Sequence, residues 1–309
     1  VLGGLLLFDV TGQDLRVDPR LLVFTGLAVA LSAVSVAWLV TRAHRRKVVT
    51  GAAGRVGELG TVEGGGDGGG RVRVSGEDWR GFLQGLLTQD VETLAPGEAR
   101  FGALLNPQGR LLFDLFVVGQ GDGAWIDVEA AHREALIMRL TMYRLRAKVQ
   151  ITADETPVLA AFGSDPGAGW IVDPRLPALG WRGYGVAATP NAEEADYDVH
   201  RLALGVPGPA DWGVEKTYPI EANFDLLNGI DFKKGCFIGQ ETTSRMKRRG
   251  QIKSRMLPID FDGAPPASGS EVLNGERRAG EVLSGRDGRA IALVRLDRIV
   301  DGELTADGQ

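Results

Sequence analysis

The order of strand-like and helix-like patterns after Arg71 is the feature that most limits how this 309-residue chain can fold. The run RVRVS at 71–75 alternates apolar and polar residues, and residues 100–129 are typical of three strands joined by the turns NPQG and GQGDG. Helical patterns come between strands at irregular intervals, unlike the regular strand–helix–strand spacing of a doubly wound parallel sheet. The pattern therefore predicts an α+β fold.

Residues 71–252 and 253–309 differ in their predicted content. Within the first range, residues 76–91 place apolar side chains three and one positions apart, which indicates one face of a helix (Trp79, Phe82, Leu83, Leu86 and Leu87). Residues 130–151 are expected to form a helix that runs into a strand. The second range is rich in strand and turn patterns, so we expect a small C-terminal β-barrel there.

The composition excludes several kinds of site. A net charge of −5 and a pI near 5.4 disfavour general polyanion binding, so no nucleic acid partner is expected. Cys236 is the only cysteine, which rules out an internal disulfide and a metal site built on several cysteines of this chain. His44, His132 and His200 are scattered without paired spacing, so no intrinsic metal site is expected.

A different pattern occupies the first seventy residues. Residues 21–40 carry no charge, and about 20 helical residues span roughly 30 Å, the thickness of the hydrocarbon core of a bilayer. The basic stretch TRAHRRK at 41–47 predicts that the C-terminal side is cytoplasmic. We therefore expect an extracytoplasmic stub at 1–20, a transmembrane helix at 21–41 and a single-pass inner-membrane protein. A buried core helix is the alternative.

Residues 42–70 are predicted to form a β segment and a glycine-rich linker. VVTGAAGRVGELGTVE at 48–63 is typical of the start of a small OB-like barrel, and EGGGDGGG at 63–70 is either a linker or a tight loop between strands. Residues 1–79 thus resemble the C-terminal part of NfeD-type membrane proteins.

The ends of the chain suggest a fragment or a fusion. It begins on Val and stops abruptly at TADGQ, and a junction is expected near Arg71. A genuine membrane-tethered protein stays open as the other interpretation, as does truncation of the terminal barrel.

Six motifs follow one another along residues 71–309: FLQGLLTQDV, NPQGRLLFDLFV, YRLRAKV, RLALGVP, PIEANFD and FKKGCFIGQE. In these motifs the chain resembles the YgfZ family, folate-binding relatives of the glycine cleavage T-protein that include mitochondrial proteins for maturing iron–sulfur enzymes. The last motif, K-G-C-x-x-G-Q-E, is the most specific. The resemblance implies a T-protein-like folate-binding domain at 71–252, tetrahydrofolate as ligand, a role in [4Fe–4S] cluster assembly or repair, and Cys236 as the essential thiol.

Two positions depart from the T-protein pattern. Where the T-protein has two adjacent acids after its N-x-x-G-G turn, this chain has Phe113 and Asp114. In the R-x-E-x-G motif, whose glutamate anchors the pterin, RLALG places Ala203. These changes argue against aminomethyl transfer and remove the usual pterin anchor, so folate binding would depend on other groups.

The residues around the cysteine predict a shaped loop followed by a helix. Gly235 and Gly239 allow positive φ values and close backbone approach. Residues 240–249 are typical of a helix with Glu241 in its first turn, basic residues in its last turn and Gly250 as a C-terminal glycine.

Cys236 itself lies between two lysines, Lys233 and Lys234, and the start of this helix. Positive charge and backbone N–H groups favour the thiolate, the form that binds iron or attacks an electrophile. One cysteine cannot hold a cluster alone, so Cys236 could complete a site shared with a partner. A buried structural cysteine is the alternative.

Seven further residues are assigned to ligand binding: Asp114, Arg146, Glu221, Lys234, Gly239, Gln240 and Glu241. Asp114 interrupts an apolar strand, so its carboxylate is either a satisfied buried group or faces a cavity. Arg146 and Glu221 either form a structural ion pair or hold a folate.

Other polar and aromatic residues stay ambiguous. The basic residues between 245 and 255 are typical of a solvated face, or dock an acidic partner or a folate tail. Trp170, Trp181 and Trp212 are candidates for stacking on a pterin.

The sequence therefore predicts a folate-binding accessory protein that is more an assembly factor than an enzyme. Its partners would be iron–sulfur assembly proteins and [4Fe–4S] client enzymes. Two alternatives stay open: a tetrahydrofolate-dependent, aminomethyltransferase-like enzyme, and a membrane scaffold of NfeD type held through residues 21–41. Residues 71–309 are expected to be cytoplasmic and soluble on their own.

Overall fold

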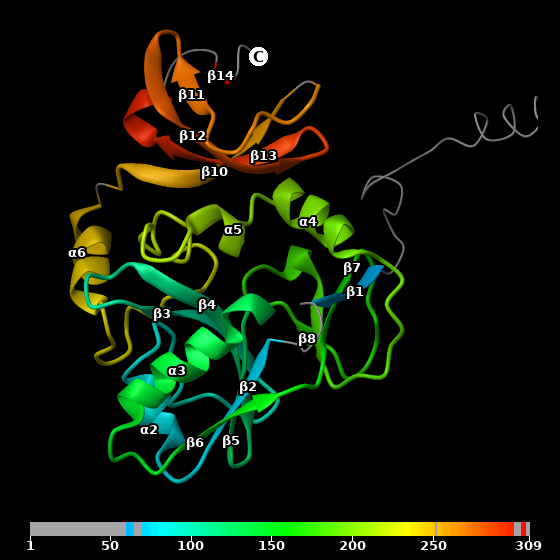
Figure 1. Ribbon diagram of the computed structural model, residues 1–309, viewed down its shortest axis with the longest axis vertical. Helices are drawn as coiled ribbons and strands as arrows, with labels where there is room; N and C mark the ends of the chain where they lie inside the picture. The colour runs from blue at the N-terminus through cyan, green and yellow to red at the C-terminus, as the bar shows by residue number, and fades with distance from the viewer. Residues whose placement is uncertain (1–59, 65–69, 251, 262, 300–303, 307–309) are drawn as a thin grey trace, which may run out of the picture. The chain divides into compact units, whose positions relative to one another are not determined.

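A computed structural model describes residues 60–64, 70–250, 252–261, 263–299 and 304–306 (Figure 1). The predicted stub and transmembrane helix at 1–41, and the predicted β segment up to residue 59, lie outside this part. Among the described residues, no helix combines the length and apolar character needed to cross a membrane.

An antiparallel sheet of five strands, here called the body sheet, follows Gly70. Its spatial order is β3-β4-β5-β2-β6. The three strands predicted within 100–129 are confirmed as β3, β4 and β5. The bounds are β2 Arg71–Ser75, β3 Ala99–Leu105, β4 Leu111–Gln120, β5 Gly123–Asp127 and β6 Gln150–Asp154.

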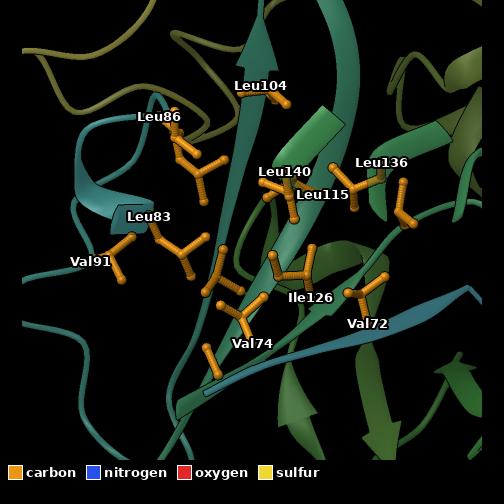
Figure 2. Packing of buried hydrophobic residues seen from close by; sticks show 14 of the residues in the cluster. Val72, Val74, Leu83, Leu86, Val91, Leu104, Leu115, Ile126, Leu136 and Leu140 are labelled. Atoms are coloured by element: carbon orange, nitrogen blue, oxygen red, sulfur yellow. The ribbon is translucent and has the colours of Figure 1, made fainter. Parts of the chain in front are cut away.

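Two helices complete the hydrophobic core on one face of the body sheet. The second, α3 (Arg133–Arg144), buries Leu136 and Leu140, which lie one turn apart. The first, α2 (Trp79–Gln84), is shorter than the predicted pattern because Gly85 ends it and Leu87 instead bridges to Leu104. Figure 2 shows the packing of this core, whose labelled members are Val72, Val74, Leu83, Leu86, Val91, Leu104, Leu115, Ile126, Leu136 and Leu140.

A second sheet has the order β1-β7-β9-β8. Its first strand corrects the predicted boundary, because residues 60–64 were assigned to an NfeD-like segment but pair antiparallel with β7. The first two residues of the stretch EGGGDGGG, Glu63 and Gly64, therefore belong to a strand of this sheet and not to a linker. The bounds are β1 Gly60–Gly64, β7 Val158–Phe162, β8 Ile171–Val172 and β9 Trp181–Tyr184.

The rest of the body contains short helices and turns. Three α-helices follow the second sheet: α4 Glu194–Ala203, α5 Pro209–Trp212 and α6 Gln240–Arg249. Single 3-10 turns occupy Ala130–His132, Pro177–Leu179 and Leu296–Arg298. The predicted helix 240–249 is confirmed with both of its ends.

The C-terminal region forms a third antiparallel sheet, ordered β10-β13-β12-β11-β14. This finding agrees with the predicted β-rich terminal unit. The bounds are β10 Ser254–Asp260, β11 Glu271–Asn274, β12 Arg277–Arg286, β13 Arg289–Arg295 and β14 Leu304–Ala306.

The terminal sheet is joined to the body through β10 and the turns at 217–228. Met256 is fully buried in a core shared with the body, and its carbonyl accepts a hydrogen bond from Nδ2 of Asn223 at 2.6 Å. The Asp225 side chain is 1% exposed and accepts two bonds of 2.9 Å from the Arg255 guanidinium. Arg255 and the nearby Lys247 hold the pKa of Asp225 below its usual value, although burial opposes them.

We expect Asp225→Ala to destabilise the protein by about 3 kcal/mol, because it leaves the guanidinium of Arg255 enclosed without its carboxylate. The measurement is chemical denaturation at neutral pH. Asp297→Ala is the matched control, since it breaks an exposed arginine–aspartate pair that contributes nothing measurable. Equal effects of the two substitutions would show that the buried pair does not hold this junction together.

Candidate functional site

Strand β4 separates a hydrophobic core from a cavity. Phe113 and Leu115 belong to the core covered by α2 and α3, whereas Asp114 and Phe116 face a cavity of about 290 Å³. This alternation follows from the two-residue period of a strand. The acid was predicted to be either a satisfied group or a cavity-facing group, and the structure brings it to the cavity. Phe113 lies on the other face, so an acid at its position would not reach this cavity.

Two arginines form a wall of the cavity and stack on Phe116. The Arg175 and Arg182 guanidinium carbons lie 4.9 and 3.9 Å from the centre of the Phe116 ring. Arg175 donates to both carboxylate oxygens of Asp173 at 3.0 and 2.8 Å, and Arg182 donates to Asp127. The arginine charges are thus neutralised and held in place, because each has a buried carboxylate partner.

Asp114 has a buried acceptor atom that is free to bind a donor in this cavity. Its Oδ1 is buried and has no hydrogen-bond partner among the described residues. Burial raises the pKa of Asp114 to about 6, while the positive charge of Arg175 partly opposes this rise. A buried carboxylate oxygen without a donor is costly. A ligand that donates N–H groups to this oxygen would therefore remove the cost and gain binding energy.

The cysteine motif forms an exposed loop that leads into α6. Cys236 is exposed, which excludes the buried structural cysteine. Gly239 begins α6 with φ 78°, and Gly250 ends it with φ 64°, as the glycine pattern predicts. Glu241 is in the first turn and is exposed, while the side-chain oxygen of Gln240 accepts the N–H of Phe237 at 3.2 Å.

Lys234 fastens this loop to the body. Its ammonium donates to the backbone carbonyls of Gln84, Leu87 and Gln89 at 2.7, 2.6 and 2.9 Å. Burial lowers the pKa of Lys234 to about 8. All three N–H bonds of the ammonium are used, so Lys234 positions the loop and has no donor left for a ligand.

Gly239 lies directly on the turn between β3 and β4. A Cβ at Gly239 would come within 2.8 Å of the Asn106 carbonyl oxygen and of the Gly109 Cα. Gly109, in turn, has φ 84° and would place a Cβ 2.9 Å from Cβ of Thr242. Backbone therefore packs on backbone here, and the NPQG turn sets the position of the cysteine loop.

We expect Gly239→Ala to destabilise the protein by about 2 kcal/mol, because the added Cβ meets rigid backbone at a positive φ. Gly235→Ala is the matched control: no atom lies within 4 Å of its Cβ position and its φ is not positive, contrary to the prediction for that glycine. Thermal unfolding of both variants measures the difference. Loss of stability by the control alone would contradict the packing argument.

The structure does not bring Arg146 and Glu221 together. Arg146 is exposed between α3 and β6 and lines a separate groove. Glu221 accepts the N–H of Tyr218 at 3.0 Å, and burial raises its pKa. No ion pair joins the two among the described residues, so the structural ion pair, one of the two interpretations of these residues, is wrong.

Other expected positions also lie away from the cavity. Ala203 is exposed at the end of α4 and does not line it, whereas Arg201 of the same helix does. Trp212 is 2% exposed within a core and cannot stack on a ligand, and neither Trp170 nor Trp181 lines the cavity.

Sequence reasoning missed the arginine wall. The pairing of Arg175 with Asp173 is local, and the acid and the base two residues apart in the VDPR stretch at 172–175 were a weak signal for it. By contrast, Arg182 and Asp127 are 55 residues apart, so no local pattern connects them.

Comparison with known proteins identifies the family. A family model described as "CAF17, C-terminal beta-barrel domain" matches residues 253–309, the range predicted to form the terminal barrel. The human "Iron-sulfur cluster assembly factor IBA57, mitochondrial" is 32% identical over 269 residues, which cover 74% of this chain and 76% of that protein. The chain belongs to the IBA57 family. The Mycosarcoma maydis IBA57 homologue is 33% identical, and the match covers 66% of this chain and 59% of that protein.

The fold of this IBA57-family chain is that of the T-protein. The crystal structure of glycine cleavage system aminomethyltransferase T from Bartonella henselae matches with a TM-score of 0.65 at 18% identity, covering 84% of this chain and 85% of that one. The predicted T-protein-like body with a C-terminal barrel domain is therefore confirmed. The resemblance of residues 1–79 to NfeD-type proteins has no counterpart among these matches.

Proposed function

We propose that this chain is an iron–sulfur cluster assembly factor that acts through the thiol of Cys236. The observation that carries the proposal is an exposed cysteine on a loop held by the Lys234 ammonium and by the backbone contact at Gly239. The human relative is named an iron–sulfur cluster assembly factor, which supports the same role here. The thiol is accessible, and its loop is held in place by these two contacts.

The chemistry of one thiol limits what the chain can do. A thiolate binds iron, but a cluster needs several such ligands, and no group of three or more potential metal ligands gathers in the described part of the chain. Cys236 therefore supplies one ligand to a cluster whose other ligands come from a partner. Iron–sulfur assembly proteins and [4Fe–4S] client enzymes are the partners of this kind. The cluster is cargo, so the role is that of an accessory protein.

The cavity at Asp114 is proposed as the folate site. A pterin ring carries adjacent N–H donors that match a carboxylate, and Asp114 has a buried oxygen free to accept. The cavity volume of about 290 Å³ is at the lower end for ligand pockets, so it admits the ring and leaves the tail outside. The residues present thus fit a tetrahydrofolate, whose bound ring would be held by Asp114 against the stacked arginine wall.

Aminomethyl transfer is the weaker interpretation. The likeness to an aminomethyltransferase concerns the fold alone, and Phe113 is 5% exposed inside the core. The membrane scaffold depends on residues 21–41, outside the described part. The matched relatives are named mitochondrial, whereas a cytoplasmic location for residues 71–309 rests on the sequence.

Cys236→Ser should abolish assembly activity while leaving the fold intact, because the side chain is exposed and serine binds iron poorly. The measurement is the activity of a [4Fe–4S] enzyme in cells that lack their own family member and express the variant. Circular dichroism and thermal unfolding serve as controls for folding. Wild-type activity of the folded variant would exclude the thiol mechanism.

Tetrahydrofolate binding should weaken as the pH falls through about 6, because protonation removes the Asp114 carboxylate as an acceptor for two donors. Asp114→Asn should bind at least about tenfold more weakly at pH 7.5 and lose this pH dependence. Anaerobic calorimetry at several pH values measures both. Identical pH profiles for the two proteins would place the ligand elsewhere or exclude it.

A further inference from the structure

The outer face of α3 exposes an apolar stripe. Met138, Met142 and Leu145 are 68%, 63% and 88% exposed and lie four and three residues apart, so they share one face of the helix and its end. Leu136 and Leu140 on the opposite face are fully buried. Contiguous exposed apolar side chains mark interaction sites, and methionine is frequent at binding surfaces because it adapts its shape.

Leu145 projects from a strained backbone. Its φ of 44° and ψ of −106° are unusual for a branched residue, and no buried contact compensates for this conformation, since the side chain is 88% exposed. Strain of this kind is maintained where the surrounding structure requires it and clusters at functional sites. The connection to β6 that begins here lines a shallow groove of about 480 Å³.

Positive charge lies beside one end of the stripe, where Arg144, Arg146 and Lys148 line the groove next to Leu145, whereas Glu134, which is 78% exposed, lies one turn before Met138 at the other end. Arg139, Arg144 and Arg146 form no ion pair within the described part of the chain. Lys148 pairs with Glu77 at 2.7 Å, and Arg133 pairs with Glu155 at 2.9 Å. The unpaired arginines make the Leu145 end of this face locally positive although the whole chain carries −5. Such a face is complementary to carboxylates.

We propose that this face, made of Met138, Met142, Leu145, Arg144 and Arg146, docks an acidic surface of a partner protein in cluster assembly. The proposal rests on the proposed function and adds to it a binding surface separate from the cysteine loop. On the partner, an apolar depression would receive Leu145 and a protruding side chain would enter the groove beside it. Carboxylates of the partner would pair with Arg144 and Arg146.

Other occupants fit less well. A second copy docked on the same face would bring its arginines against these arginines. Residues 41–47 of this chain carry four basic residues and would be repelled in the same way. An anionic bilayer would attract the arginines, but a flat surface leaves the groove beside Leu145 unfilled.

The test uses the full chain, expressed at graded levels in cells that lack their own family member, with [4Fe–4S] enzyme activity as readout. Met142→Glu and Arg144→Glu should each raise the expression level needed for half-maximal activity at least about fivefold, with the maximum retained. Val172→Glu, at a 48% exposed apolar residue of β8, is the matched control and should leave this level unchanged. Unchanged levels in both α3 variants, or a lower maximum at full expression, would overturn the docking role.

The same experiment separates the two proposals. Cys236→Ser should fail at every expression level, because overexpression restores docking but cannot restore the thiol. An active Cys236→Ser variant would refute the proposed function. The docking face would then be judged by its own binding measurement.

That measurement replaces Met142 with a photoreactive amino acid in the full chain. The expected adduct is with an acid-rich segment of another protein, and it should disappear in the Arg144→Glu background. An adduct within residues 1–59 or with a second copy would contradict the proposal. So would flotation with phosphatidylglycerol vesicles that requires Arg144.

Discussion

The burial of strand β4 on both faces is the constraint on which the rest of the site depends. Leu115 packs into the core under α2 and α3, while Leu111 and Phe116 belong to the second core shared with the terminal sheet. A strand buried on both sides normally carries only apolar residues. Asp114 is tolerated because its side chain faces a cavity, where Arg175 offsets part of the cost of burying a charge. The presence of an acid in β4 therefore depends on the cavity that this strand lines.

The turn before β4 connects this cavity strand to the cysteine loop. Gly109 closes the turn and lies against Gly239, so the start of α6 is positioned by backbone contact and not by long side chains. Lys234 adds a second attachment, to the last residue of α2 and to the segment that follows it. Two rigid attachments leave Cys236 between them exposed and restrained. Under the proposed function, such a loop would lose little conformational entropy when its thiol binds a metal, which would favour transient but specific ligation.

Local patterns predicted the parts of this site that are local. The β3–β4–β5 strands, helix α6 and the positive φ of Gly239 follow from periodicity, turn residues and glycine placement. The contacts that form the cavity were not predictable in this way, because Arg182 reaches Asp127 across 55 residues. A pairing of Arg146 and Glu221 was considered only because both are charged residues within family motifs. Their separate positions show that a motif says little about which residues contact each other. The face of β4 occupied by Phe113 depended on the strand register, which no single sequence determines.

Under the proposed function, a single cysteine would explain why a separate docking surface is needed. The bond between the Cys236 thiolate and the cluster must break when the partner leaves with the cluster. If this bond supplied most of the binding energy, the partner would leave too slowly. Affinity is therefore better supplied by protein contacts that do not change during transfer. The chain is negative overall, so unpaired arginines beside α3 would direct the proposed acidic partner to one face despite general repulsion. Apolar contact by Met138, Met142 and Leu145 then adds affinity that salt does not screen.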